Sequence, residues 1–428
     1  MNDNHPDYDE YLPYYLQVRT FIKGMDCKAY LQNVVRGTDS ESTTRNKEYK
    51  ARAKYTNFSG RTLNALQGAI YRKDPVIKLP KELEYLITNA DGAGKSLTHV
   101  SKNTTSNLIQ VGRHGIYTTY GESAKIVTYT AENIPNYEVD EAGILTKVVL
   151  ITGKDETKHL IIDSEGFFAV EYYKDDSDVP YKTISPSKSD GTELDYIPFT
   201  FVGSIDNSPD TDSMPLWSIV DVSQGHYQNS AENEDIARFM VPTIAATVPN
   251  EHWQKEMLPN GYELGGGALI PLPENGQAMI LQASPNQMHA EMMKDKENQL
   301  IMLGARLISG TAKSNQTAEA ARIEFSAENS VLDNLVQNAS EAIEKHLRIC
   351  AEFMGVNVGE DDIEFNLNRE YYDTAVNPQM IASEMLLLDR GIIAVPDVRS
   401  NLRKVGYLEA DRTDEDIDGE IEVSGNGL

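Results

Sequence analysis

The stretch TAEAARIEFSAENSVLDNLVQNASEAIEKHLRICAEFM, residues 317–354, decides how the rest of the chain is arranged. Thr317 is a suitable N-cap, and Gly355 stands where a left-handed C-cap residue belongs. At about 1.5 Å per residue the predicted helix is about 57 Å long, far longer than the usual globular helix. Its apolar side chains recur at three- and four-residue spacing and therefore lie on one stripe; they are Phe325, Leu332, Leu335, Val336, Ala339, Ala342, Ile343, Leu347, Cys350 and Met354.

A helix of this length needs neighbours to cover its apolar stripe. Two arrangements provide them: a domain-spanning helix inside one chain, or a spoke in a ring of identical subunits. The helix pattern alone favours the first arrangement. A second amphipathic helix, QMHAEMMKDKENQLIMLGARL (287–307), precedes the long one across the short polar break SGTAKSNQ (309–316). The two helices form a pair that copies of the chain, arranged around a hollow axis, would stabilise.

A third helical segment, PLWSIVDVSQGHYQNSAENEDIARFM (215–240), lies upstream and has Pro215 in its first turn. The forty or so residues between this segment and the 287–307 helix are rich in Gly and Pro. They predict a small strand-and-loop module held between two helices.

The remaining segments divide into helices and strands. Residues 8–71 are predicted helical, and residues 28–55 carry much of the local basic charge, which indicates either a solvated face or a nucleic-acid contact. From residue 114 to 203 the pattern alternates with period two and predicts a mainly antiparallel sheet of about six strands. Two short helices and an acidic tail, expected to be solvated and disordered, end the chain.

Composition excludes several classes of protein. A length of 428 residues allows two or three structural regions with a substantial core. The net charge of −27 argues against a simple basic coat for nucleic acid, although it allows a pore through which nucleic acid slides without being gripped.

Cys27 and Cys350 lack metal-ligand spacing and are expected to be reduced thiols, Cys350 on the buried stripe. No apolar run is long enough for a bilayer span and the N-terminus is unlike a signal peptide, so we expect a soluble, intracellular protein with no membrane contact.

The motif GAGKS (92–96) invites a phosphate-loop interpretation, and with it a nucleotide hydrolase. The full motif G-x-x-x-x-G-K-[ST] requires a glycine five positions before Gly94, where this chain has Asn89. The preceding run is predicted helical, whereas a phosphate loop follows a buried strand. We therefore interpret the segment as a turn between helices, with Ser96 as the N-cap of the next helix.

The order of these segments resembles the portal proteins of tailed double-stranded DNA bacteriophages, in particular a subfamily long filed as a domain of unknown function. The resemblance rests on NFSGRTLNALQGAIYRKDP, NADGAGKSLTHVSKNTTSNLIQVGRHGIYTTYG, IPFTFVG followed by PLWSIVDVSQGHYQNSAENED, LGARLISG followed by the long helix, and LLLDRGIIAVPDVRSNLRKVG. None of these is a catalytic signature. In that subfamily the D-G-x-G turn is structural, so Lys95 need not bind nucleotide.

The resemblance implies an α+β portal architecture: a helical N-terminal region, an antiparallel wing sheet, paired stem helices with an inserted clip, a long wing helix and a short helical crown. The implied divisions are 1–80 (N-terminal helical part of the wing), 81–214 (wing with antiparallel strands), 215–247 (stem helix), 248–283 (clip), 284–308 (second stem helix), 309–316 (tunnel loop), 317–360 (long wing helix) and 361–428 (short crown and acidic tail).

The implied function is structural, without catalysis, cofactor or metal. The chain would form a homo-oligomeric ring, most commonly of twelve subunits, at one capsid vertex of the virion, after assembly in the host cytoplasm. Its partners would be terminase (the packaging motor), head–tail adaptor and tail proteins, major capsid and scaffolding proteins, and the double-stranded DNA that passes through the channel. The main alternative is a head–tail adaptor or another virion structural protein.

Two sets of residues are candidates for these contacts. Those best placed to touch DNA phosphate or line the channel are Lys294, Lys296, Lys313, Ser314, Asn315 and Gln316. For the three lysines a solvated surface position is an equally good interpretation. Those expected to pack between subunits are Leu332, Leu335 and Leu347.

Overall fold

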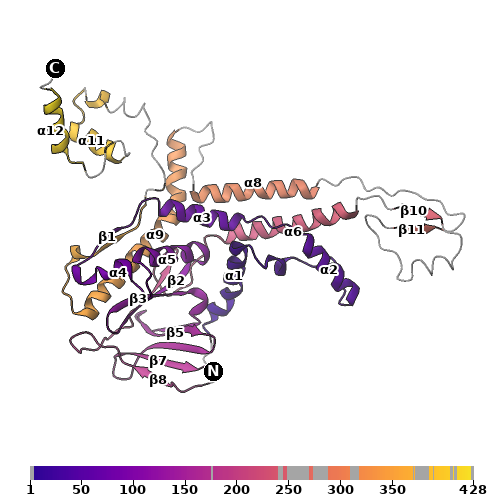
Figure 1. Ribbon diagram of the computed structural model, residues 1–428, viewed down its shortest axis with the longest axis horizontal. Coiled ribbons are helices and arrows are strands. Elements are labelled where there is room, and N and C mark those ends of the chain that lie inside the picture. Colours follow the sequence, from indigo (N-terminus) through magenta and orange to yellow (C-terminus); the bar gives the residue numbers. More distant parts are fainter. Residues whose placement is uncertain are drawn as a thin grey trace. The chain divides into compact units, whose positions relative to one another are not determined.

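The computed structural model describes residues 4–174, 177–239, 244–247, 269–272, 288–308, 318–369, 371, 385–388, 390–404, 408 and 412–425. The chain forms two compact units, Met1–Arg369 and Glu370–Leu428. The larger unit combines helices with antiparallel sheets (Figure 1), as the α+β prediction requires. None of the helices in the described ranges is long and apolar enough to cross a membrane.

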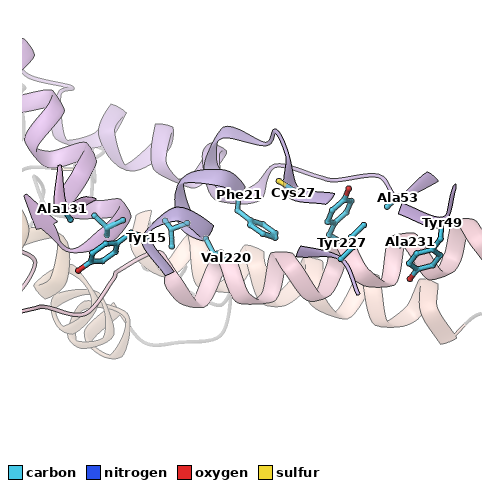
Figure 2. Close-up of a cluster of buried hydrophobic side chains, with 12 residues drawn as sticks. Tyr15, Phe21, Cys27, Tyr49, Ala53, Ala131, Val220, Tyr227 and Ala231 are labelled. Atoms are coloured by element: carbon cyan, nitrogen blue, oxygen red, sulfur yellow. The ribbon is translucent and has the colours of Figure 1, made fainter. Parts of the chain in front are cut away.

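The N-terminal region is helical, as predicted, and supplies one side of a hydrophobic cluster. Its helices are α1 (Pro6–Lys23), the short 3-10 turn η1 (Cys27–Tyr30), α2 (Ser40–Arg52) and α3 (Phe58–Ile70). Figure 2 shows side chains from α1 and α2, such as Phe21 and Tyr49, directed toward Tyr227 and Ala231 of helix α6 (Trp217–Phe239). These residues are almost fully buried, so the N-terminal helices and α6 form one continuous core.

The segment between α3 and the first sheet contains short elements and one full helix. They are β1 (Val76–Lys78), η2 (Lys81–Leu83), α4 (Tyr85–Thr88) and α5 (Leu97–Val111). Strand β1 pairs antiparallel with β12 (Glu364–Asn366), which follows the 3-10 turn η4 (Glu360–Asp362). Ser96 accepts a hydrogen bond from the amide of His99 at the start of α5, so the predicted N-cap is confirmed.

The strands predicted between residues 114 and 203 are present, but they form two sheets rather than one. The first has the order β3 (Ala124–Thr130), β2 (Arg113–Tyr120), β9 (Phe199–Gly203). The second is a meander of β4 (Asn136–Val139), β5 (Leu145–Gly153), β6 (Glu156–Ile162), β7 (Phe168–Lys174) and β8 (Lys182–Ile184). The chain leaves the first sheet through the 3-10 turn η3 (Ala131–Asn133) and returns to it only at β9, which period-two spacing does not reveal.

The long helix is α9 (Ala318–Met354), and Gly355 follows it with a φ of 67°. The predicted helix and its left-handed C-cap are therefore confirmed, while the proposed N-cap Thr317 lies outside the described residues. Helix α9 packs against α5, strands β2, β3 and β9, and β12 of the same unit. His346 of α9 is fully buried, its Nδ1 lies 2.7 Å from Oγ1 of Thr118 on β2, and burial lowers its pKa to about 3.

The described part of the apolar stripe is covered by the chain itself. Leu332, Leu335 and Leu347 are 4 %, 1 % and 0 % exposed in the single chain. These leucines leave almost no surface for another copy to contact, which corrects the expectation that they pack between subunits. Cys350 is also fully buried, and both it and Cys27 are free thiols. Met354 is only half-buried, and the side chain of Phe325 lies outside the description.

Helix α8 (Met288–Ile308) and helix α6 confirm the two helices expected on either side of an insertion. Of the insertion itself the structure describes two short strands, β10 (Ile244–Thr247) and β11 (Leu269–Leu272), which pair in parallel. The proposed clip, 248–283, therefore lies outside the described residues except for β11. The proposed tunnel loop, 309–316, lies outside them entirely.

The smaller unit contains α11 (Val395–Lys404) and α12 (Asp414–Gly425). Arg399 of α11 pairs with Asp418 of α12 at 2.5 Å, and Arg403 pairs with Asp414. Thr413 caps α12 by accepting a hydrogen bond from the amide of Asp416. The acidic tail is thus partly helical, which corrects the expectation of disorder: its acids sit in the first turn of a capped helix and meet arginines of α11.

We predict that Leu347→Ala lowers the free energy of unfolding by about 2–5 kcal/mol, because it removes a fully buried side chain and leaves a cavity in the core of the chain. Thermal or denaturant unfolding of the purified protein measures the loss. Asn334→Ala, at an exposed position on the same helix, is the matched control and should change stability by less than about 0.5 kcal/mol. Equal stabilities of the two variants would show that the core around α9 is not packed as described.

Candidate functional site

The antiparallel helix pair α6/α8 is the candidate functional site. Two reciprocal contacts fix the register of the pair: Nε2 of His226 lies 3.1 Å from Oε1 of Glu297, and Nδ1 of His289 lies 3.0 Å from Oε2 of Glu232. The later position in α6 pairs with the earlier position in α8, so the two helices run antiparallel. Figure 1 shows them side by side.

Close packing between the two helices depends on a glycine. A Cβ placed on Gly225 of α6 would lie 2.9 Å from Cε of Lys296, so the aliphatic part of this lysine crosses α6 where no side chain is present. Leu300, one turn further along α8, is 3 % exposed. Small residues permit such close approach of two helices, and the lysine stem covers apolar surface while its charged end stays in water.

Helix α2 is fixed to α6 by a carboxylate that accepts from two arginines. Asp235 of α6 lies 2.5 Å from the guanidinium of Arg45 and 2.8 Å from that of Arg52, and its side chain is 10 % exposed. Burial alone would raise the pKa of Asp235, but the hydrogen bonds from Arg45 and Arg52 outweigh burial and lower the pKa. Such charge-assisted bonds are among the stronger polar contacts in proteins. They attach α2 firmly to the side of α6.

The predicted DNA-contact residues divide into two groups. Lys294 is exposed on α8, and Lys296 is half-buried over Gly225, so Lys296 belongs partly to the packing between the helices. Lys313, Ser314, Asn315 and Gln316 lie outside the described residues.

The contacts that hold α2 and α8 against α6 do not follow from the sequence. Asp235 meets Arg45 and Arg52 across more than 180 positions, and His226 meets Glu297 across 71. No local spacing carries that information.

The GAGKS turn does not have the geometry of a phosphate loop. The helical segment α4 precedes it, where a phosphate loop requires a strand. The amides of Ala93 and Lys95 donate to the carboxylate of Asp91, and the amide of Gly94 donates to Oδ1 of Asn89. These amides are the groups that would otherwise bind phosphate. Within the described ranges, no cluster of His, Cys, Asp and Glu has an arrangement that could hold a metal ion.

Comparisons with known proteins add the following. A family model described as a domain of unknown function, DUF4055, matches residues 215–354, the stretch from the start of α6 to the end of α9. No curated protein matches the chain.

Three solved structures of gene transfer agent (GTA) particles contain similar chains. A chain from the neck of an empty GTA particle, computed with C6 symmetry, is 11 % identical with a TM-score of 0.41, over 82 % of this chain and 90 % of that one. A chain from the virion of a native GTA particle is 12 % identical with a TM-score of 0.40, over 81 % and 89 %. A chain from the neck of the native particle, computed with C12 symmetry, is 11 % identical with a TM-score of 0.40, over 81 % and 89 %.

We predict that Asp235→Asn lowers the free energy of unfolding by about 2 kcal/mol at neutral pH, because it leaves two arginines without their carboxylate. The folded-state pKa of Asp235 is below its ordinary value of 3.8, so its contribution is present above that value and is lost as pH falls through the folded-state pKa. The stability gap between wild type and variant should therefore shrink in strong acid.

Denaturant unfolding over a pH series measures this gap. Asp221→Asn, at an exposed position near the start of the same helix, is the control. A gap that is absent at neutral pH, or one that widens in acid, would contradict the role assigned to Asp235.

Proposed function

We propose that this chain is a portal-type structural subunit of a tailed bacteriophage. Twelve copies would form a ring at one vertex of the capsid, and the ring would conduct double-stranded DNA during packaging and ejection. It would also bind terminase and, later, the head–tail adaptor and tail proteins, next to the major capsid and scaffolding proteins. We propose no catalytic activity.

The observation that carries this proposal is the helix pair with an insertion at its far end. Helices α6 and α8 run antiparallel, the sequence between them contains strands β10 and β11, and α9 follows α8 in the sequence after nine residues. The family match covers these same elements, residues 215–354. A helix pair beside a long buried helix, in the order that the sequence resemblance implies, is what a stem and wing require.

A second observation concerns which surfaces remain exposed. The described part of the α9 stripe is buried inside the chain, whereas α8 keeps apolar side chains in water on more than one side: Met292 is 41 %, Ile301 61 % and Met302 51 % exposed. Several exposed apolar side chains on one element favour contact with another protein. A head-to-tail contact through this element closes into a ring when its rotation permits.

The alternative is a head–tail adaptor or another virion structural protein. An adaptor would also form rings, so ring formation alone does not separate the two. Binding of the packaging motor does separate them, because the motor engages the portal before any adaptor is added.

We predict that the purified chain forms closed rings, with a mass close to twelve subunits by native mass measurement and a central hole in class-averaged images. Deletion of residues 248–283 should leave the rings intact and abolish binding of the packaging motor, because the deleted segment is inserted in the sequence between the two helices. A chain that is monomeric at every concentration would contradict the proposal. Intact motor binding by the deletion variant would contradict the role of the insertion.

We also predict that the protein does not bind Mg-ATP and that Lys95→Ala changes neither ring formation nor stability by a measurable amount. The amides of the GAGKS turn already donate to Asp91 and Asn89, and Lys95 is largely exposed. Isothermal titration with Mg-ATP measures the binding. Tight binding that disappears in Lys95→Ala would favour the nucleotide hydrolase instead.

A further inference from the structure

Helix α6 carries α2 and α8 on two different flanks. Its side chains toward α2 include Gln228 and Asp235, and those toward α8 include His226 and Glu232. At about 100° per residue Asp235 projects from the side of α6 opposite His226, whereas Glu232 lies between them, one turn from both Gln228 and Asp235. Figure 1 shows α8 and α2 on opposite sides of α6. Each of the two outer helices therefore has a surface that α6 does not cover.

The outer surface of α2 is basic. Lys28 of η1 and Lys47 and Lys50 of α2, called here the basic flank, line a groove of about 660 Å³ that contains no acidic residue. None of these three lysines forms a salt bridge within the part of the chain that the structure describes. In a chain with a net charge of −27, residues 28–54 hold seven Lys or Arg against three Asp or Glu. The basic flank is thus a local exception to an acidic molecule.

Two exposed apolar residues, Val34 and Met25, are close in sequence to residues that line the groove, and Val34 is linked to it by a hydrogen bond. Val34 is 43 % exposed, and its amide donates to Oδ1 of Asn46, a residue that lines the groove. Met25, three positions before Lys28, is 62 % exposed. Lysines beside exposed apolar side chains suit a protein surface that combines acids with apolar groups. A phosphate backbone would use the lysines and leave Val34 and Met25 in water.

The outer surface of α8 has the complementary composition. Met292, Asp295, Gln299 and Met302 follow one another at spacings of three and four, so they share the side of α8 away from α6. Glu291 lies beside them. We call these five residues the methionine–acid face. Neither Glu291 nor Asp295 forms a salt bridge among the described residues, and both are exposed.

Building on the ring assembly proposed above, we propose that the basic flank of one copy binds the methionine–acid face of α8 in the next copy. A contact between two different surfaces of the same chain is head-to-tail, which is the kind that closes into a ring. Subunits that each carry a charge of −27 repel one another, so their interface needs local opposite charge. The lysines of the basic flank provide it, and the methionines adapt to Val34 and Met25.

Charge reversal tests this contact. Lys47→Glu with Lys50→Glu, and separately Glu291→Lys with Asp295→Lys, should each raise the concentration for half-assembly at least tenfold, measured by mass photometry or light scattering. All four substitutions in one chain should restore assembly, because every contact then contains the reversed pairs. Restored assembly also shows that the substituted chains fold.

The matched control is Lys154→Glu with Lys174→Glu. It makes the same change in net charge as the first variant, at exposed positions on the five-stranded sheet, and should assemble as the wild type does. A loss of assembly in this control equal to that in the basic-flank variant would overturn the contact in favour of a general charge effect.

The remaining outcomes separate this contact from the proposed function. If the wild type forms rings and both reversal variants form them equally well, the contact is wrong and the ring proposal stands. If the wild type never assembles, both are wrong. If the basic-flank variant assembles normally but loses binding to a DNA duplex in a fluorescence anisotropy titration, the groove binds phosphate and the contact is overturned.

Discussion

The burial of α9 inside a single chain is the constraint on which the rest of the structure depends. Leu335, Val336, Ile343 and Leu347 are all essentially inaccessible to water, and the elements that cover α9 come from distant parts of the sequence. Fully burying an aliphatic side chain of this size contributes about 1.5–3 kcal/mol before the loss of chain entropy is counted. This packing holds the three-stranded sheet, α5 and β12 around one helix, and it does so without a second subunit.

Because this core is complete within one chain, only surfaces outside it are left for contacts with other copies. Helix α6 joins the core at its first turns, where Leu216, Ile219 and Val220 are buried, and α2 and α8 then pack along its length. The arginines on Asp235 and the two histidine–glutamate contacts fix both neighbours in register. The pair is therefore held in a defined orientation relative to the rest of the larger unit.

The sequence predicts the elements of this fold better than their contacts. The period of α9, its glycine C-cap, the helices on either side of the insertion and the N-cap at Ser96 all follow from local rules, and the structure confirms them. The division of the strands into two sheets does not follow from local rules. Alternation of apolar and polar residues indicates a strand but does not show which strand it pairs with. The same limit applies to the leucines expected between subunits: periodicity shows that Leu332 and Leu347 are covered and does not show what covers them. The acidic tail is predicted to be disordered from its composition alone. Composition does not show that its acidic residues form ion pairs with Arg399 and Arg403.

The central claim is that each chain is completed by its own core and assembles through its outer helices. Hydrogen exchange of the isolated and the assembled protein tests it most directly. We expect amides of residues 331–353 to be equally protected in both forms, and amides of residues 288–302 to exchange more slowly on assembly. Protection of residues 331–353 that appears only in the assembled protein would contradict it.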